Sequence, residues 1–158
     1  MLFRRRIRYG LLFGEVQVTS PALEGIAVWL PSKRASMPMW RELLAGGAGL
    51  FRTVGADAVS RMTQVSEHNE RLRLACVPNP HWVLSILAVD PEHQRQGHAA
   101  ALLEPMLTRL DRERTPCYAE TTDPGVLPFY ERVGFHVDTP STVPGTTLAV
   151  WPLGRQPA

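Results

Sequence analysis

The chain has 158 residues, of which 44% are hydrophobic and 20% are charged, and its formal net charge is +2. We expect one soluble, cytoplasmic domain over residues 1–158, because this balance supports a core and the small charge gives no reason to expect a nucleic-acid partner. No apolar run is long enough to span a membrane, and Cys76 and Cys117 lack metal-ligand spacing, which favours reduced thiols.

The first segment is strongly basic, with four arginines within residues 4–8. An export or transit signal is one interpretation, but no small-x-small cleavage site follows. A nucleic-acid-binding arm is another, but aromatic residues do not alternate with the arginines. The interpretation we favour is a basic helix whose apolar side chains pack inward. These inward residues would be Leu2, Phe3, Ile7 and Leu11.

Two short strands follow. The alternation over residues 14–19 predicts a strand with Val16 and Val18 inward, and the apolar run at 25–30 predicts a second strand that ends at Pro31. Residues 36–76 are predicted to be a mostly helical insertion in two pieces, separated at Gly46, Gly47 and Gly49 because glycine is costly inside a helix. Polar neighbours place His68 on a solvent-exposed helix face.

The central stretch begins with an apolar, β-branched run at 83–89, which predicts a buried strand, and Asp90-Pro91 ends it. A turn at 94–100 leads into a helix that starts near Gly97 and bends at Pro105 without ending. Small residues let a ligand approach the main chain, and N–H groups of a first helical turn bind anions. A phosphate or pyrophosphate is therefore the expected ligand, with Arg95 beside it.

The remaining elements are shorter. We predict a strand at 116–122, a short helix at 126–133, and terminal strands at 135–139 and 147–151, joined by a turn at 140–145. The tail after Pro152 is expected to be frayed.

Gln94, Gly97 and Ala99 form a Q-x-x-G-x-A pattern after V-D-P, and P-F-Y-E-R-x-G-F occupies residues 128–135. In these motifs the chain resembles the GCN5-related N-acetyltransferase (GNAT) family. The segments H-W-V-L-x-x-L-A-V-D-P, P-C-Y-A-E-T and V-P-G-T-T resemble the puromycin N-acetyltransferase branch. The resemblance covers residues 80 to 152 and implies an α/β fold: a mixed, mostly antiparallel sheet, splayed in the middle and flanked by helices. An acyl-coenzyme A core would lie at about 82–139, and the family's first strand and helix would be lacking.

The resemblance also implies an activity. The chain would transfer an acetyl group from acetyl-CoA, with no metal, to a primary amine, by direct attack in a ternary complex. A small-molecule amine is the expected acceptor and a homodimer is possible. The alternative is a non-catalytic acyl-CoA-binding or interaction module of the same fold, because the chain lacks the first strand and carries Val126 where close relatives have a cofactor-binding asparagine.

Tyr130 occupies the family's tyrosine position and is the predicted general acid; packing against the pantetheine arm is the alternative role. Glu120 is the predicted general base, although attraction of a cationic amine or a structural hydrogen bond would also explain it. Glu15 is a weaker choice, and Cys117 is not expected to be a nucleophile. The main chain of the central strand would stabilise the oxyanion. The predicted cofactor-binding residues are Leu87, Ala88, Val89, Gln94, Arg95, Gln96, Gly97, His98, Ala99 and Ala100.

Overall fold

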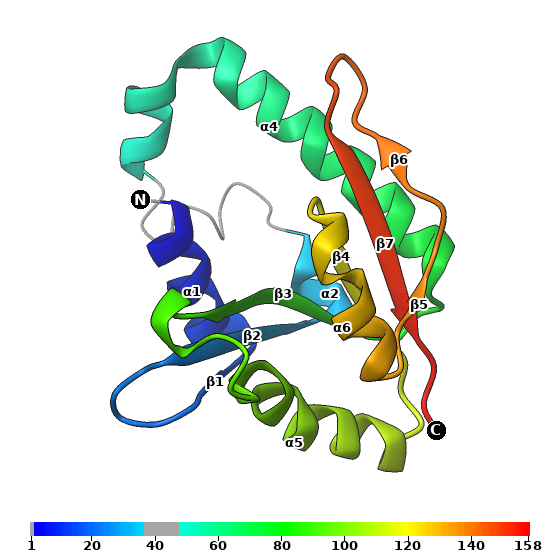
Figure 1. Ribbon diagram of the computed structural model, residues 1–158. Coiled ribbons are helices and arrows are strands. Elements are labelled where there is room, and N and C mark those ends of the chain that lie inside the picture. The colour runs from blue at the N-terminus through cyan, green and yellow to red at the C-terminus, as the bar shows by residue number, and fades with distance from the viewer. Residues whose placement is uncertain (1, 37–47) are drawn as a thin grey trace.

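The computed structural model describes residues 2–36 and 48–158, and Figure 1 shows its arrangement. Its helices are α1 (Leu2–Phe13), α2 (Ser32–Ala35), α4 (Ala48–Cys76), α5 (His98–Arg112) and α6 (Leu127–Arg132), with 3-10 turns at Pro91–His93 and Pro124–Val126. Its strands are β1 (Glu15–Val18), β2 (Gly25–Pro31), β3 (Trp82–Val89), β4 (Cys117–Thr121), β5 (His136–Val137), β6 (Ser141–Thr142) and β7 (Ala149–Arg155).

The strands form one mixed sheet in the order β1-β2-β3-β4-β7-β5, with β6 paired to β7. The β3–β4 pair is parallel and the other pairs are antiparallel. This confirms the predicted α/β class with helices flanking a mixed, mostly antiparallel sheet. Among the described residues β1 pairs only with β2, so it forms an edge of the sheet.

Strand β2 holds the two layers together because its side chains alternate between the faces of the sheet. Ala27 and Trp29 belong to the main core with Leu102 and Leu103 of α5. Leu30 instead packs with Tyr9 of α1. Helices α1 and α5 therefore cover opposite faces of the same strands.

Strands β3 and β4 separate soon after they meet. They pair at only two positions, Trp82 with Cys117 and Val83 with Tyr118. From Leu84 onward β3 keeps its pairing with β2, while β4 keeps its pairing with β7. The two halves of the sheet thus diverge in the middle, which opens space beside residues 84–89 of β3. A register shift opposite Val28 and Trp29 leaves Ser85 without a β2 partner, a bulge that sequence patterns did not predict.

Helix α1 forms where it was predicted, but the predicted inward face is wrong. Phe3 is 52% exposed and Leu11 is 68% exposed, whereas Arg5, Tyr9 and Gly10 are buried. A Cβ at Gly10 would collide with the side chain of Val28, so the absence of a side chain lets the helix lie close to β2. Close approach at Gly10, and not the spacing of leucines, decides which face is buried. Ile7 is half-buried, and the side chain of Leu2 lies outside those that the structure describes.

The helical insertion also differs from the prediction. The predicted second piece is confirmed as α4, which ends at Cys76 as expected. The predicted first piece and two of the three separating glycines, Gly46 and Gly47, lie outside the described residues. Gly49 lies inside α4 and does not break it. His68 is only 8% exposed, so the predicted solvent-exposed position is wrong too. Helix α4 packs against β7 instead of standing free in solvent, so part of its polar surface is covered. Within the ranges 2–36 and 48–158, no helix combines the length and apolarity that a membrane span requires.

The end of the chain is ordered, so the predicted frayed tail is wrong. Strand β7 continues through Leu153, which is fully buried, to Arg155. The guanidinium of Arg155 donates to both carboxylate oxygens of Asp111, at 2.7 and 2.8 Å, and its Nε donates to the carbonyl of Val133. This contact joins the end of α5 to the far half of the sheet. The predicted turn at 140–145 contains β6, and β5 is shorter than expected.

Candidate functional site

A cleft of about 1780 Å³ lies where β3 and β4 diverge. One end is lined by the turn between β3 and α5. The other end is lined by side chains from α1, α4 and β4, including Arg6, Asn69, Arg73, Tyr118 and Glu120. We call these the loop end and the side-chain end of the cleft.

The loop end presents main-chain groups. Gly97 precedes α5 with a φ of 89°, and Arg95 has a φ of 61°; both values lie in the left-handed region. An added Cβ on Gly97 would meet nothing within 4 Å, so the surface there is open. The N–H groups that follow it lie in the first turn of α5 and have no partner within the helix. Such an array suits a phosphate or pyrophosphate.

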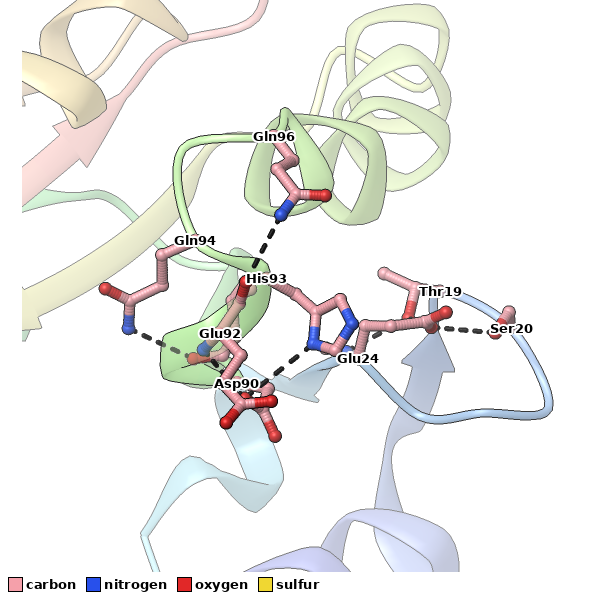
Figure 2. Close-up of polar contacts among 10 residues, drawn as sticks. Thr19, Ser20, Glu24, Asp90, Glu92, His93, Gln94 and Gln96 are labelled. Atoms are coloured by element: carbon pink, nitrogen blue, oxygen red, sulfur yellow. Dashed lines mark hydrogen bonds and ion pairs between the residues drawn. The ribbon is translucent and has the colours of Figure 1, made fainter.

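Short contacts of its own hold this turn in shape (Figure 2). The Asp90 carboxylate accepts a hydrogen bond from the backbone N–H of Glu92 at 2.9 Å. The amide of Gln94 donates to the carbonyl of Val89, and that of Gln96 donates to the carbonyl of Glu92, both at 3.2 Å. These bonds fix the shape of the turn from within the chain, which lowers the entropy cost of binding a ligand.

The neighbouring β1–β2 loop supports the same turn (Figure 2). The carboxylate of Glu24 accepts hydrogen bonds from the hydroxyls of Thr19 and Ser20, each at 2.7 Å, and they lower its pKa to about 2. The backbone N–H of Asp90 donates to the carbonyl of Glu24 at 2.7 Å. Two loops far apart in the sequence are thus tied together behind the loop end.

Most of the predicted cofactor-binding residues line the cleft. Those that do are Leu87, Val89, Gln94, Arg95, Gly97, His98, Ala99 and Ala100. Ala88 and Gln96 are not part of the lining, and the side chain of Gln96 is turned back to Glu92. Their roles toward a cofactor stay predictions.

Tyr130 lies on α6 and lines the cleft, although only 8% of the residue is exposed. Its ring packs edge-on against Phe129 and Phe135, with centroids 5.4 Å apart in each pair. Burial raises the pKa of its phenol to about 12, so it stays protonated at neutral pH. Across the part of the chain that the structure describes, its hydroxyl has no hydrogen-bond partner, so the proton can be donated to a group in the cleft.

Glu120 lies on β4 at the side-chain end of the same cleft. Its Oε2 accepts a hydrogen bond from the hydroxyl of Tyr118 at 3.1 Å, and its Oε1 accepts one from the amide of Asn69 at 2.7 Å. Burial raises the pKa of the Glu120 carboxyl, whereas these two donors and the positive charges of Arg6 and Arg73 act to lower it. A carboxylate with a raised pKa is suited to accept a proton near neutral pH.

The other two candidates lie elsewhere. Glu15 is on the edge strand β1 and forms an ion pair with Arg109 at 2.9 Å, outside the residues that line the cleft. Burial raises the pKa of the Cys117 thiol to about 12, which keeps it protonated and makes it a poor nucleophile. Neither residue is placed to take part in chemistry in the cleft.

A buried polar cluster supports the side-chain end from below. The guanidinium of Arg73 contacts a carboxylate oxygen of Glu70 and donates to Nε2 of His81, both at 2.5 Å. Since Nε2 accepts, the proton of the neutral ring is on Nδ1, which donates to the carbonyl of Pro78 at 2.9 Å. Burial lowers the pKa of His81, so the ring stays neutral. This cluster anchors α4 to the start of β3.

Sequence reasoning missed two residues that contact Glu120. Tyr118 could have been found, because residues two apart on a strand point to the same face. Asn69 could not, because it lies 51 positions away on a helix and nothing in its local pattern marks it. Among the side chains that the structure describes, no group of three or more His, Cys, Asp or Glu is arranged to hold a metal ion.

Comparison with known proteins bears on the family and the fold. A family model described as "Acetyltransferase (GNAT) domain" matches residues 24–147. Among solved structures, the chain is similar to SsHAT, with a TM-score of 0.58 and 22% identity over 86% of this chain and 67% of that one. It is also similar to histone acetyltransferase HPA2 and related acetyltransferase from Corynebacterium glutamicum ATCC 13032, with a TM-score of 0.52 and 20% identity over 86% of this chain.

A third structure, described as an acetyltransferase, has a TM-score of 0.52 and 18% identity over 86% of this chain. At these identities the likeness shows the fold. The chain spans 59% of the length of the Corynebacterium protein and 65% of the third.

Proposed function

Because the chain belongs to the GNAT acetyltransferase family, we propose that it transfers an acetyl group from acetyl-CoA to a primary amine. The observation that carries this proposal is that one cleft joins an anion-binding turn, a protonated tyrosine and a carboxylate with a raised pKa. The pyrophosphate of acetyl-CoA would bind the main chain at 97–100 with Arg95 beside it. The pantetheine arm would lie along residues 87–89 of β3, where β4 has separated.

The residues of the cleft divide the proton transfers between them. Glu120 would take a proton from the acceptor ammonium, which leaves a neutral amine to attack the thioester carbonyl. The new C–N bond forms as the C–S bond breaks, and Tyr130 would give its proton to the departing thiolate. The resulting phenolate would then take up the second proton that the nitrogen loses as it becomes an amide. Main-chain N–H groups of β3 that face away from β2 can donate to the carbonyl oxygen as it becomes negative.

A small-molecule amine is the acceptor we propose, because the motifs of the sequence resemble the puromycin N-acetyltransferase branch. The side-chain end also offers apolar surface for such a molecule, from Phe3, Met62 and Val65. This surface lies beside the charged groups of the same end. The competing function is a module that binds acyl-CoA without turnover. Val126 on the cleft wall motivates it, since valine cannot replace the asparagine of close relatives as a hydrogen-bond donor.

Calorimetric titration of acetyl-CoA tests the loop end. We expect saturable binding to the parent chain and loss of binding in Gly97→Glu, whose carboxylate would repel the pyrophosphate. Gly97→Ala has the same strained backbone without the charge and should keep most of the affinity. Gly145→Glu is a second control, because Gly145 also has a positive φ and open space but lies outside the cleft lining. No binding by a folded parent at millimolar acetyl-CoA would overturn the proposal.

Release of free CoA thiol in the presence of a panel of primary amines tests turnover. Amine-dependent release that depends on Tyr130 and Glu120 supports the acetyltransferase. Tight binding of acetyl-CoA without release across aliphatic, aromatic and peptidyl amines would favour the non-catalytic module instead.

A further inference from the structure

The carboxylate of Glu120 is held from two sides by residues of different elements. Tyr118 comes from its own strand, β4, whereas Asn69 comes from α4, 51 positions earlier in the chain. Each donor contacts a different carboxylate oxygen, at 3.1 and 2.7 Å. A carboxylate oxygen can accept more than one hydrogen bond, so both oxygens keep lone pairs for the cleft.

The orientation of the Asn69 amide is set by this contact. A carboxylate can only accept, so the NH₂ group of Asn69 must face Glu120. Its carbonyl oxygen is then left buried without a hydrogen-bond partner. Leaving a buried acceptor unsatisfied costs stability, and such a group calls for an explanation. A purely structural amide would be expected to satisfy both of its ends.

We propose that Asn69 is a positioning residue for Glu120: its donation from α4 keeps the carboxylate ionised and directs the remaining lone pairs toward the acceptor amine. This inference rests on the proposed function, in which Glu120 is the base. In this proposal α4 has two roles, because the helix lines the side-chain end of the cleft and also contributes to proton transfer.

The surrounding charges make the Asn69 contact important. The charged and titratable groups that face Glu120 are Tyr118 of β4, Arg6 of α1 and Arg73 of α4. Arg73 forms an ion pair with Glu70, which partly neutralises its charge, and solvent screens the exposed charge of Arg6. Both effects weaken the influence of these arginines on Glu120. Burial and the adjacent carboxylate raise the pKa of Tyr118, so it stays a neutral donor. The two hydrogen bonds are therefore the main influence that lowers the pKa of Glu120 against the rise caused by burial.

The direct test is a titration of the Glu120 side chain by NMR, with ¹³C-labelled glutamate and the signal assigned through Glu120→Gln. In Asn69→Leu, which removes the donor and keeps the volume, we expect the Glu120 pKa to rise by about one to two units. The control is Gln64→Leu, which removes an exposed amide of α4 outside the cleft lining. Identical titration curves for the parent and a folded Asn69→Leu protein would overturn the proposal.

A second variant covers the case in which Asn69→Leu fails to fold. Asn69→Asp is nearly isosteric, cannot donate when ionised and places a like charge beside Glu120, so the Glu120 pKa should rise at least as far as in the leucine variant. An unchanged Glu120 titration in this variant would equally contradict the proposal. Thermal unfolding establishes that each variant is folded at the pH values used.

The kinetic test separates positioning from mere support. With an amine that turns over, the acidic limb of the pH profile of kcat/KM should move to higher pH in Asn69→Leu, with activity recovering above that limb. A residue that only supports the fold would lower activity equally at every pH. The NMR titration needs no acceptor, so it tests the contact separately from turnover. A shifted Glu120 pKa without any turnover would support the role of Asn69 and contradict the acetyltransferase. Turnover with an unshifted Glu120 pKa would support the acetyltransferase and contradict the role of Asn69.

Discussion

The two ends of the cleft are built in different ways. The loop end comes from one continuous stretch, residues 87–100, and works through backbone N–H groups at the start of a helix. The side-chain end brings together α1, α4 and β4, and works through side chains such as Asn69, Tyr118 and Glu120. A main-chain site needs small residues and a turn, whereas a side-chain site needs distant elements to be placed correctly. The loop end should therefore tolerate changes elsewhere in the fold better than the side-chain end does.

The largest expected effect is at Tyr130. The variant Tyr130→Phe should lower kcat by about 100-fold to 10,000-fold, the usual contribution of a general acid or base, because the hydroxyl of Tyr118, the other tyrosine in the cleft lining, already donates to Glu120. The affinity for acetyl-CoA, measured by calorimetry, should change by less than about twofold, since no hydrogen bond to the protein is lost. A kcat within about threefold of the parent would show that the ring only packs beside the cofactor.

The pH dependence of the parent sharpens this point. Because burial raises the pKa of Tyr130 to about 12, its proton remains available well above the pH at which an ordinary tyrosine ionises. Activity should not fall between about pH 9 and pH 11 through ionisation of this group. A decline centred near pH 10 in the parent that is absent in the phenylalanine variant would contradict the burial argument.

The contact between Asp111 and Arg155 joins the helix of the loop end to β7 on the far side. Asp111→Asn should lower the free energy of unfolding by about 1–3 kcal/mol near neutral pH, because it weakens a bidentate contact and leaves Arg155 without its counter-charge. Urea unfolding measures the loss. Asp57→Asn, on the exposed surface of α4, is the control and should change stability by less than about 0.5 kcal/mol.

The sign of the pH effect follows from the lowered pKa of Asp111, which falls from 3.8 to about 2 on folding. The unfolded chain binds this proton more readily, so the stabilisation is complete above about pH 4 and is lost as the pH falls toward 2. The difference between the parent and Asp111→Asn should shrink over the same window. A difference that stays constant from pH 6 to about pH 2 would show that the carboxylate charge is not responsible.

A smaller effect is expected at the loop end. Arg95→Asn removes a charge but keeps a residue that tolerates a positive φ, so it should weaken acetyl-CoA binding by about threefold to tenfold at low salt. The loss should decrease at high salt, because screening weakens exposed charges. Arg114→Asn is a matched control, since Arg114 also has a positive φ and lies outside the cleft lining. Equal losses in both variants would point to the backbone and not to the charge.

The smallest effect is expected at Leu11 of α1, which lies outside the cleft lining. Leu11 is 68% exposed, so Leu11→Ser should change the free energy of unfolding by less than about 0.5 kcal/mol. Tyr9→Phe should cost about 1 kcal/mol, because the buried hydroxyl donates to the carbonyl of Arg34 at 2.8 Å. If Leu11→Ser lowered the free energy of unfolding more than Tyr9→Phe does, the buried face of α1 would be the one that the apolar spacing predicts.

Much of the fold could be read from the sequence. The hairpin β1–β2, the central strand β3, the turn at 94–100 and helix α5 lie within one or two residues of their predicted bounds, and Pro105 does not end the helix. These elements have strong local signals: alternation, a β-branched run, small residues before a helix, and apolar residues at helical spacing. The turn is a main-chain structure, so the small residues and the helix start that suit it to an anion are visible in the local sequence, whereas its support by Glu24 of the β1–β2 loop is not.

Other features were decided only by tertiary contacts. Gly10 allows α1 to approach β2 and thereby buries Tyr9 instead of Leu11, and His68 of α4 is buried although its neighbours in the sequence are polar. The bond from Arg155 to Asp111 orders a tail that composition alone would leave frayed. The partnership of Asn69 with Glu120 joins residues 51 positions apart. Periodicity describes one element at a time, whereas these contacts depend on which element lies opposite, and only the folded chain determines that.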